Sequence, residues 1–280
     1  MKQITDIKEI QSIELGILED IARFCDANGI RYTLSGGTLL GAIRHKGFIP
    51  WDDDADVAML RPDYDRFVNE YHSDRYRLLS METNTYPGVY AKVIDTRTRA
   101  RERHSAKNIG VWVDVFPLDG APRKGYCPLS TSFFWKRYRT IVKYRNYPLF
   151  SRRVSVRECL LSILGTPFRL VSNKRLISPL VRQMRRHSVI DSPFIGFIGG
   201  TGYATRETIQ RTAFDDFIPV MLEGRIFSAM RGWHDYLSSL YGNYMIPPPP
   251  EKQKACHDFE AWWEQDPKET VDTAQSLGYK

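Results

Sequence analysis

The chain has 280 residues, of which 42% are hydrophobic and 26% are charged, and its formal net charge is +7. This composition is sufficient for a folded core and excludes a disordered or low-complexity chain. No apolar run approaches the roughly 18 to 20 residues needed to cross a bilayer, and the first residues lack the apolar core of a signal peptide, so we expect a cytoplasmic protein.

The first predicted element is a helix over residues 6–28. Its isoleucines recur at helical spacing, and the sequence Asn28-Gly29 is typical of a helix C-terminus. We expect this helix to pack against a sheet. The four cysteines of the chain are too far apart for a zinc site, so we expect them to be reduced thiols.

An anion-binding turn is predicted next, between a short strand over residues 30–34 and a short helix over residues 38–43. Glycines allow the backbone to approach a ligand closely, and the N–H groups at the start of a helix attract phosphate. A cationic cluster follows the helix. The candidate phosphate-binding residues are therefore Ser35, Gly36, Gly37, Thr38, Arg44, His45 and Lys46.

Four carboxylates then occur within five residues, at Asp52, Asp53, Asp54 and Asp56. An apolar run begins among them, and because side chains along a strand alternate between faces, Asp52, Asp54 and Asp56 would share one face. A hard divalent cation such as Mg²⁺ would relieve their repulsion. The alternative is a solvated acidic turn. Together with the glycine turn, the acids indicate a site for phosphoryl or nucleotidyl transfer.

Three further elements are predicted before the next acid, namely a helix from Pro62 to about Tyr71 and strands over residues 75–80 and 89–95. Lys92, in the second strand, would reach a phosphate, although a lysine in a strand is more often solvated. In the strand predicted over residues 109–119, valines alternate on one face and leave Asp114 on the other. A metal shared with the earlier acids would offset the cost of burying that carboxylate, and the alternative is a structural, hydrogen-bonded Asp. Asp119 is expected to cap a turn.

The segment from residue 121 to residue 190 differs in composition. It contains sixteen Lys and Arg but one acid, Glu158, so it accounts for the basic charge of the whole chain. Helices are predicted over residues 132–144, 157–170 and 174–187. Such an insert would lie on an anionic membrane surface or hold a polyanionic acceptor, and the alternative is a solvated helical face. No nucleic-acid-binding motif occurs, so we expect no nucleic acid partner.

The block from Gly36 to Asp56, Gly-Gly-Thr-Leu-Leu-Gly-Ala-Ile-Arg-His-Lys-Gly-Phe-Ile-Pro-Trp-Asp-Asp-Asp-Ala-Asp, closely resembles the LicD family, which is related to fukutin and fukutin-related protein in the nucleotidyltransferase-fold superfamily. The match extends to the strand around Asp114, and the resemblance makes Asp114 the third acid. Near the C-terminus it adds Glu223 and His257 as candidate substrate contacts, with structural roles as the alternative. Asn243 stands where the family has an acid, so it receives no metal role.

We expect an α/β (α+β) fold, with a nucleotidyltransferase-like mixed sheet, flanking helices and a basic helical insert. A single catalytic domain would cover residues 1–280, with its core at about 1–120 and 190–260 and the insert at about 121–190. The resemblance implies a transferase that moves a phospho-alcohol group, commonly phosphocholine from CDP-choline, to a cell-surface glycan such as lipopolysaccharide or teichoic acid, with release of CMP. Such an enzyme would work in the cytoplasm, peripherally at the inner face of the plasma membrane.

In the implied mechanism, Asp54, Asp56 and Asp114 would hold two Mg²⁺ or Mn²⁺ ions, with Asp52 as a further ligand. Asp114 would also accept the proton of the acceptor hydroxyl, and the glycine turn with Arg44 or Lys46 would offset the charge of the diphosphate. Three alternatives stay open: a nucleotidyltransferase that releases pyrophosphate, a metal-dependent glycosyltransferase, and a non-catalytic membrane-associated scaffold.

Overall fold

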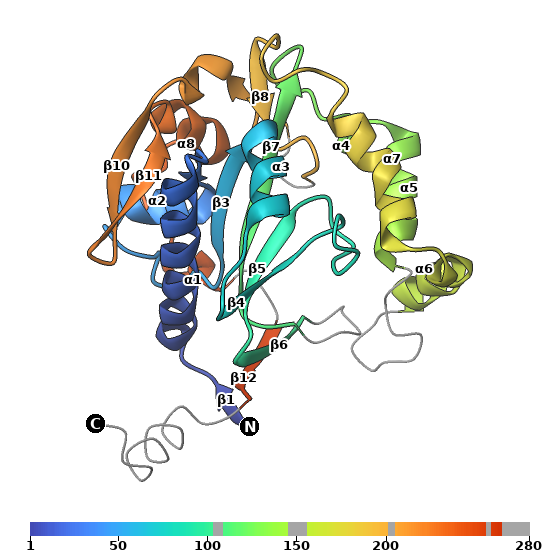
Figure 1. Ribbon diagram of the computed structural model, residues 1–280, viewed down its shortest axis with the longest axis horizontal. Coiled ribbons are helices and arrows are strands. Elements are labelled where there is room, and N and C mark those ends of the chain that lie inside the picture. The colour runs from blue at the N-terminus through green and yellow to red at the C-terminus, as the bar shows by residue number, and fades with distance from the viewer. Residues whose placement is uncertain (103–108, 145–155, 201–204, 256–258, 265–280) are drawn as a thin grey trace.

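The computed structural model describes residues 1–102, 109–144, 156–200, 205–255 and 259–264. Its centre is a mixed sheet, as expected (Figure 1). In spatial order its strands are β2 (Thr33–Leu34), β3 (Ala55–Leu60), β7 (Trp112–Ala121), β5 (Ala91–Asp95) and β4 (Tyr76–Leu79), and β8 (Phe194–Gly196) and β9 (Ile209–Gln210) continue from β7. The pairing of β3 with β7 is parallel, whereas the other pairings in this sheet are antiparallel.

Helix α1 (Ile7–Asn28) packs against β3, β5 and β7 and confirms the first predicted element. The Asp6 side chain caps its start by accepting the N–H of Lys8, and Gly29 ends it in the left-handed conformation, with φ at 62°. Its isoleucines at positions 13, 17 and 21 are buried in the core, whereas Ile7 and Ile10 in the first turn are half-buried. Helix α3 (Arg61–Glu70) follows β3 directly and contacts β3 and β7.

The elements around α2 (Gly36–Arg44) form one side of the molecule (Figure 1). They include helix α8 (Trp233–Tyr241) and the hairpin of β10 (Phe217–Leu222) and β11 (Arg225–Met230). The predicted turn at Ser35-Gly36-Gly37 is shorter than expected, because the helix already begins at Gly36 and the glycines form its first turn.

The helices of the basic segment lie on the opposite side of the sheet from α2 and α8 (Figure 1). They are α4 (Pro128–Thr131), α5 (Phe133–Tyr144), α6 (Val156–Gly165), the 3-10 helix η1 (Thr166–Leu170) and α7 (Asn173–Met184). The helix predicted over residues 157–170 is divided after Gly165, where Pro167 begins a tighter turn. None of the described helices combines the length and the apolar character needed to cross a bilayer.

A second, three-stranded sheet joins distant parts of the chain and was not predicted. Its central strand β12 (Phe259–Trp263) pairs antiparallel with β1 (Lys2–Ile4) and with β6 (Thr98–Glu102). The remaining short elements are the 3-10 helices η2 (Arg211–Phe214) and η3 (Pro250–Lys252).

The prediction for Asp119 was wrong, because this residue lies inside β7 rather than at a turn. Its two carboxylate oxygens accept hydrogen bonds from Nε and Nη2 of Arg61, at 2.8 and 2.6 Å. Both side chains are almost completely buried, so this bidentate ion pair joins the start of α3 to the far half of β7.

Candidate active site

Asp56 and Asp114 lie side by side in the centre of the main sheet. The parallel register of β3 and β7 places Asp56 opposite Asp114, and the antiparallel register of β5 and β7 places Lys92 opposite Asp114. Neighbours in register share a face of the sheet, so three charged side chains form one row across three strands. On the other face, Val113 and Val115 are fully buried, as the predicted alternation requires.

Lys92 is a buried partner of Asp114 and not a solvated lysine. Its Nζ lies 2.8 Å from Oδ1 of Asp114, and only 2% of its side chain is exposed. The ammonium group also lies 4.0 Å from the ring centroid of Trp112, with the rings of Tyr86 and Tyr90 further out. A buried lysine is costly unless it is paired, and both the carboxylate and the aromatic faces stabilise it here.

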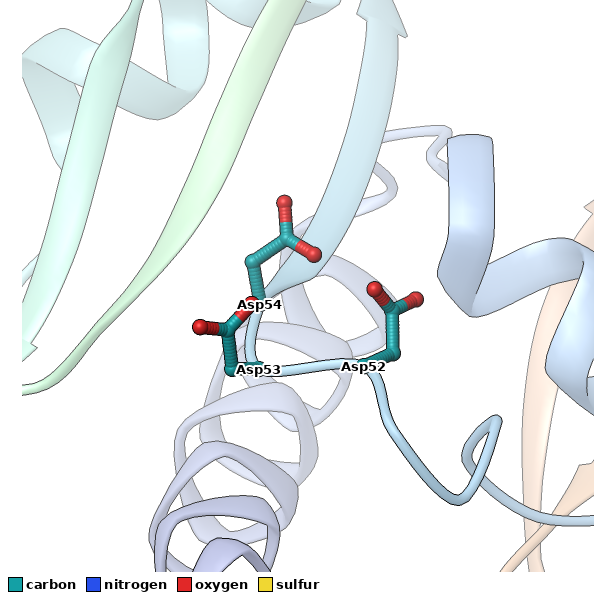
Figure 2. A group of neighbouring side chains, drawn as sticks. All are labelled: Asp52, Asp53 and Asp54. Atoms are coloured by element: carbon teal, nitrogen blue, oxygen red, sulfur yellow. The ribbon is translucent and has the colours of Figure 1, made fainter. Parts of the chain in front are cut away.

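The acids before β3 form a second group. Asp52, Asp53 and Asp54 each offer one carboxylate oxygen within 4.8 Å of the others. Figure 2 shows Asp52 and Asp54 pointing to one side and Asp53 turning away. All three precede β3, which begins at Ala55, so the expectation of a single strand carrying Asp52, Asp54 and Asp56 was correct only for Asp56.

Helix α1 is hydrogen-bonded to the loop that carries these acids. Gln11 donates hydrogen bonds from its amide to the carbonyl oxygens of Ile49 and Asp52, at 3.1 and 2.9 Å. We expected this helix only to pack on the sheet, so its contribution to the site was not predicted.

Glu14, three residues further along α1, is an acid that sequence reasoning missed. It is 1% exposed, and its Oε2 has no hydrogen-bond partner among the described residues. Burial raises its pKa well above the ordinary value, and the nearby charges of Asp54 and Asp52 add to this effect. The signal was present in the sequence, since a glutamate three residues before Ile17 and four before Leu18 falls on the apolar face of the helix.

Asp56 has a similar environment. Burial raises its pKa well above the ordinary value, and the charges of Asp54 and Asp114 raise it further. Its Oδ1 also lacks a hydrogen-bond partner within the described part of the chain. Two buried carboxylate oxygens without partners, in a group of acids, fit the oxygen ligands of a hard divalent cation.

The two glycines at the start of α2 are explained by the acids that they face. Gly36 has φ at 52°, and a Cβ atom there would lie 2.7 Å from Oδ2 of Asp56. A Cβ atom on Gly37 would collide with Oδ2 of Asp52. Thr38 also contacts this region, because its Oγ1 accepts the N–H of Asp56 at 2.8 Å. Larger residues would therefore displace the carboxylates.

Tyr236, about two hundred residues later, completes this end of α2. Its hydroxyl shares a hydrogen bond of 2.9 Å with Oγ of Ser35 and accepts the N–H of Gly36 at 3.2 Å. A cavity of about 10 Å³, on the order of one water molecule, lies beside it and is lined in part by Ser35 and Glu207. Burial raises the pKa of Glu207 to about 7.

The cationic cluster lies away from the glycines, at the other end of α2. The nine residues of the helix separate the two ends by about 12 Å. Arg44 donates from Nη1 to the carbonyl oxygen of Tyr244 at 2.7 Å, and burial lowers the pKa of His45. The structure thus brings Ser35, Gly36, Gly37 and Thr38 to the acids but leaves Arg44, His45 and Lys46 apart from the glycine turn.

Glu223 supports the loop that follows α2. Its Oε1 accepts the N–H of Phe48 at 3.0 Å, and its own N–H donates to the carbonyl oxygen of Lys46 at 3.1 Å. This is the structural role that the sequence left as the alternative. His257, the other candidate near the C-terminus, lies outside the described residues.

Comparisons with known proteins identify the family to which this chain belongs. Residues 29–155 match the family model of the LicD/FKTN/FKRP nucleotidyltransferase domain. The chain is 34% identical over 280 residues to the lipopolysaccharide cholinephosphotransferase LicD of Haemophilus influenzae, which covers 94% of this chain and 99% of that protein. The chain belongs to the LicD family.

A shorter similarity connects this LicD family member with animal proteins. Over 57 residues the chain is 42% identical to the ribitol 5-phosphate transferase FKRP of Homo sapiens and of Mus musculus, a segment that covers 20% of this chain and 10% of either FKRP. The family model includes the row of Asp56, Lys92 and Asp114. It does not include Glu14 of α1 or Tyr236 of α8, which reach the site through the folding of the chain.

In EDTA, which removes divalent ions, we expect this LicD family member to become less stable as the pH rises from about 6 to about 8, across the raised pKa of Glu207 at about 7. The folded state raises the pKa of Glu14 and of Asp56, so it holds protons that the unfolded chain has lost. The stability linked to these protons is complete below the ordinary carboxyl pKa and is lost as the pH rises through the raised values. Glu207 acts in the same direction.

The thermal unfolding midpoint in EDTA, measured at the two pH values, checks this expectation. Adding Mg²⁺ should raise the midpoint more at the higher pH, and Glu14→Gln should reduce the pH dependence in EDTA. Equal midpoints of the wild-type protein at both pH values would contradict the assignment of buried, raised carboxyls.

Proposed function

We propose that this protein is a transferase that moves a phospho-alcohol group, with phosphocholine as the first candidate, from a CDP-activated donor to a sugar hydroxyl of a cell-surface glycan such as lipopolysaccharide or teichoic acid. CMP is the second product. The observation that carries the proposal is the pairing of Asp56 with Asp114 beside the glycines of α2. It occurs in a chain that matches nearly the full length of a lipopolysaccharide cholinephosphotransferase.

The acids of the site would hold Mg²⁺ or Mn²⁺, with two ions expected. The ligands would be Asp54, Asp56 and Asp114, with Asp52 as a further one. The Oδ1 of Asp56, which lacks a hydrogen-bond partner within the described residues, and the closeness of the carboxylates of Asp52 and Asp54 support this assignment. Bound there, the cation would offset the charge of the diphosphate and of the leaving phosphate.

The chain's own groups have separate roles in the proposed reaction. The oxygen of the acceptor hydroxyl bonds to the phosphorus that carries the alcohol, the bond from this phosphorus to the bridging oxygen breaks, and CMP leaves with that oxygen. The hydroxyl proton passes to Asp114, whose side chain is 13% exposed and thus within reach of a bound acceptor. Lys92 holds Oδ1 of Asp114 and so orients the carboxylate towards the bound acceptor.

We also place the reaction in the cytoplasm, at the inner face of the plasma membrane. Cys25 and Cys127, which are buried, are free thiols, which suits a reducing compartment. The basic segment at 121–190 supports contact with an anionic membrane.

Product analysis tests the proposed reaction. The purified protein is incubated with CDP-choline, Mg²⁺ and a lipopolysaccharide or teichoic acid acceptor, and the products are identified by chromatography and mass spectrometry. We expect CMP together with a glycan that has gained phosphocholine. Calorimetry with CDP-choline, CDP-ribitol, CDP-glycerol and UDP-sugars, with and without Mg²⁺, identifies the alcohol.

Each other outcome favours a different function. Pyrophosphate as the product would replace the proposal with nucleotidyl transfer. Binding of a UDP-sugar alone would favour a glycosyltransferase, and no binding of any donor in the presence of Mg²⁺ would favour a scaffold.

A further inference from the structure

Helix α6 turns its apolar side chains towards solvent. Val156, Leu160, Ile163 and Leu164 are 80%, 59%, 50% and 66% exposed. They follow one another at steps of four, three and one, so they lie on a single face of the helix. An amphipathic helix of a globular protein normally buries such a face against the core. The orientation of α6 is therefore the reverse of the usual one.

The inner side of α6 confirms the reversal. Ser162 and Gly165 are its buried residues, and they are among its smallest. The helix thus meets the rest of the protein through small residues and presents its large apolar residues outside. The following 3-10 helix continues the pattern, because its last residue, Leu170, is 97% exposed. We call Val156, Leu160, Ile163, Leu164 and Leu170 the α6 face.

The α6 face lies at the outer end of the helical layer. In Figure 1, α6 is the part of this layer furthest from α2 and α8, beyond the ends of α5 and α7. Nothing in the described part of the chain covers it, since its side chains are exposed with the rest of the protein present.

The exposed charged residues of α6, η1 and the start of α7 are basic, whereas Glu158 of α6, an acid, is half-buried. Arg157 and Arg169 are exposed within α6 and η1, and Lys174 and Arg175 are exposed at the start of α7. Long basic side chains can place their stems along an apolar surface while their charged ends reach phosphate groups. An outward apolar face with a basic rim is the pattern of helices that lie in the interface of an anionic bilayer.

We propose that the α6 face docks this protein on the surface of an anionic lipid bilayer. The apolar side chains enter the boundary between head groups and acyl chains, and the basic residues contact lipid phosphates. A second copy of the chain is a poorer occupant, because it would bring together two segments that each carry sixteen Lys and Arg and one acid. The proposal deepens the membrane location proposed above, but it needs neither the donor nor the metal.

Sedimentation with lipid vesicles tests the proposal directly. The full chain is mixed with vesicles of phosphatidylcholine alone and with vesicles that also contain phosphatidylglycerol, without nucleotide and with EDTA. We expect binding to the vesicles with phosphatidylglycerol and weaker binding when salt is raised. The double variant L160D/L164D should lower the partition coefficient by roughly tenfold or more. Both substituted residues are exposed, so the variant should fold normally, which its thermal unfolding midpoint checks.

The matched control is Ile226→Asp, which adds a charge at an exposed isoleucine of β11, far along the chain from the α6 face. It should bind vesicles as the wild type does. Equal loss in this control, or unchanged binding of L160D/L164D, would overturn the proposal. The proposal would also be overturned if the wild-type protein bound neither kind of vesicle and formed dimers that the L160D/L164D variant did not form. That result would make a second copy of the chain the occupant of the α6 face. A membrane-bound protein without transferase activity would instead overturn only the proposed reaction.

Discussion

Replacing Asp56 by Asn should lower the rate of phospho-alcohol transfer by about a thousandfold or more. The proposed cation would lose a ligand at the reacting phosphate, and with it several kcal/mol of transition-state stabilisation, at about 1.4 kcal/mol per tenfold. The fold should persist. Asp56 is buried with a raised pKa, so its neutral amide analogue removes a cost that the metal-free protein bears. We expect the unfolding midpoint in EDTA to stay equal or to rise, while the affinity for Mg²⁺ or Mn²⁺ falls.

Initial rates of CMP formation check the first part, and calorimetric titration with Mn²⁺ checks the second. The control is Asp215→Asn, which removes an exposed carboxylate that pairs with Arg211 on the surface and should leave the rate within about twofold. A folded Asp56→Asn protein with the wild-type rate would remove Asp56 from the catalytic site. A variant that loses its fold would show instead that the carboxylate is structural.

Replacing Arg61 by Met should cost about 3 to 5 kcal/mol of unfolding free energy, the largest stability effect that we expect from a single substitution. The reason is the charge that remains. Asp119 is 1% exposed, and without the guanidinium its carboxylate would be buried without a partner. The pair lies beyond the row of acids along β7, so activity should persist at temperatures at which the variant is folded.

The unfolding free energies of three variants in urea distinguish the cost of an unpaired charge from the contribution of the whole ion pair. The double variant R61M/D119L should recover most of the loss, because two apolar side chains can replace a buried ion pair at little cost. Arg66→Met, on the exposed side of α3, is the matched control and should change the unfolding free energy by less than about 1 kcal/mol. A loss of that small size in Arg61→Met would mean that water reaches Asp119.

The main elements of the site could be predicted because their signals are local. The alternation of valines in β7 fixed the face on which Asp114 lies, and the apolar run after Asp56 indicated β3. Whether these two strands are neighbours is a different question. The LicD resemblance implied only that Asp114 is the third acid of the same site, and the parallel register shows that the strands are adjacent. Lys92 illustrates the limit. Its local pattern suggested solvent, but the antiparallel register of β5 places it against Asp114.

For α2, closeness in sequence led to the wrong prediction that the cationic cluster lies beside the glycine turn. Arg44, His45 and Lys46 are close in sequence to Gly36 and Gly37, yet the rise of a helix separates the two groups. Tyr236 is far away in sequence and contacts Gly36. No periodicity within either segment encodes such a contact, because it depends on how α8 packs beside α2.

The small sheet of β1, β12 and β6 has a consequence for the order in which the protein is made. Its central strand is the last described strand of the chain, and it pairs Lys2 with Trp263. While the ribosome is still producing the intervening residues, β1 and β6 have no strand between them, and their edges are open to pairing with other chains. Closure of this sheet must then wait until residues 259–263 have emerged, long after β1 and β6, so it follows the formation of the elements in between. A nascent chain that stalls before residue 259 would carry both open edges, which makes these two strands the expected sites of co-translational aggregation.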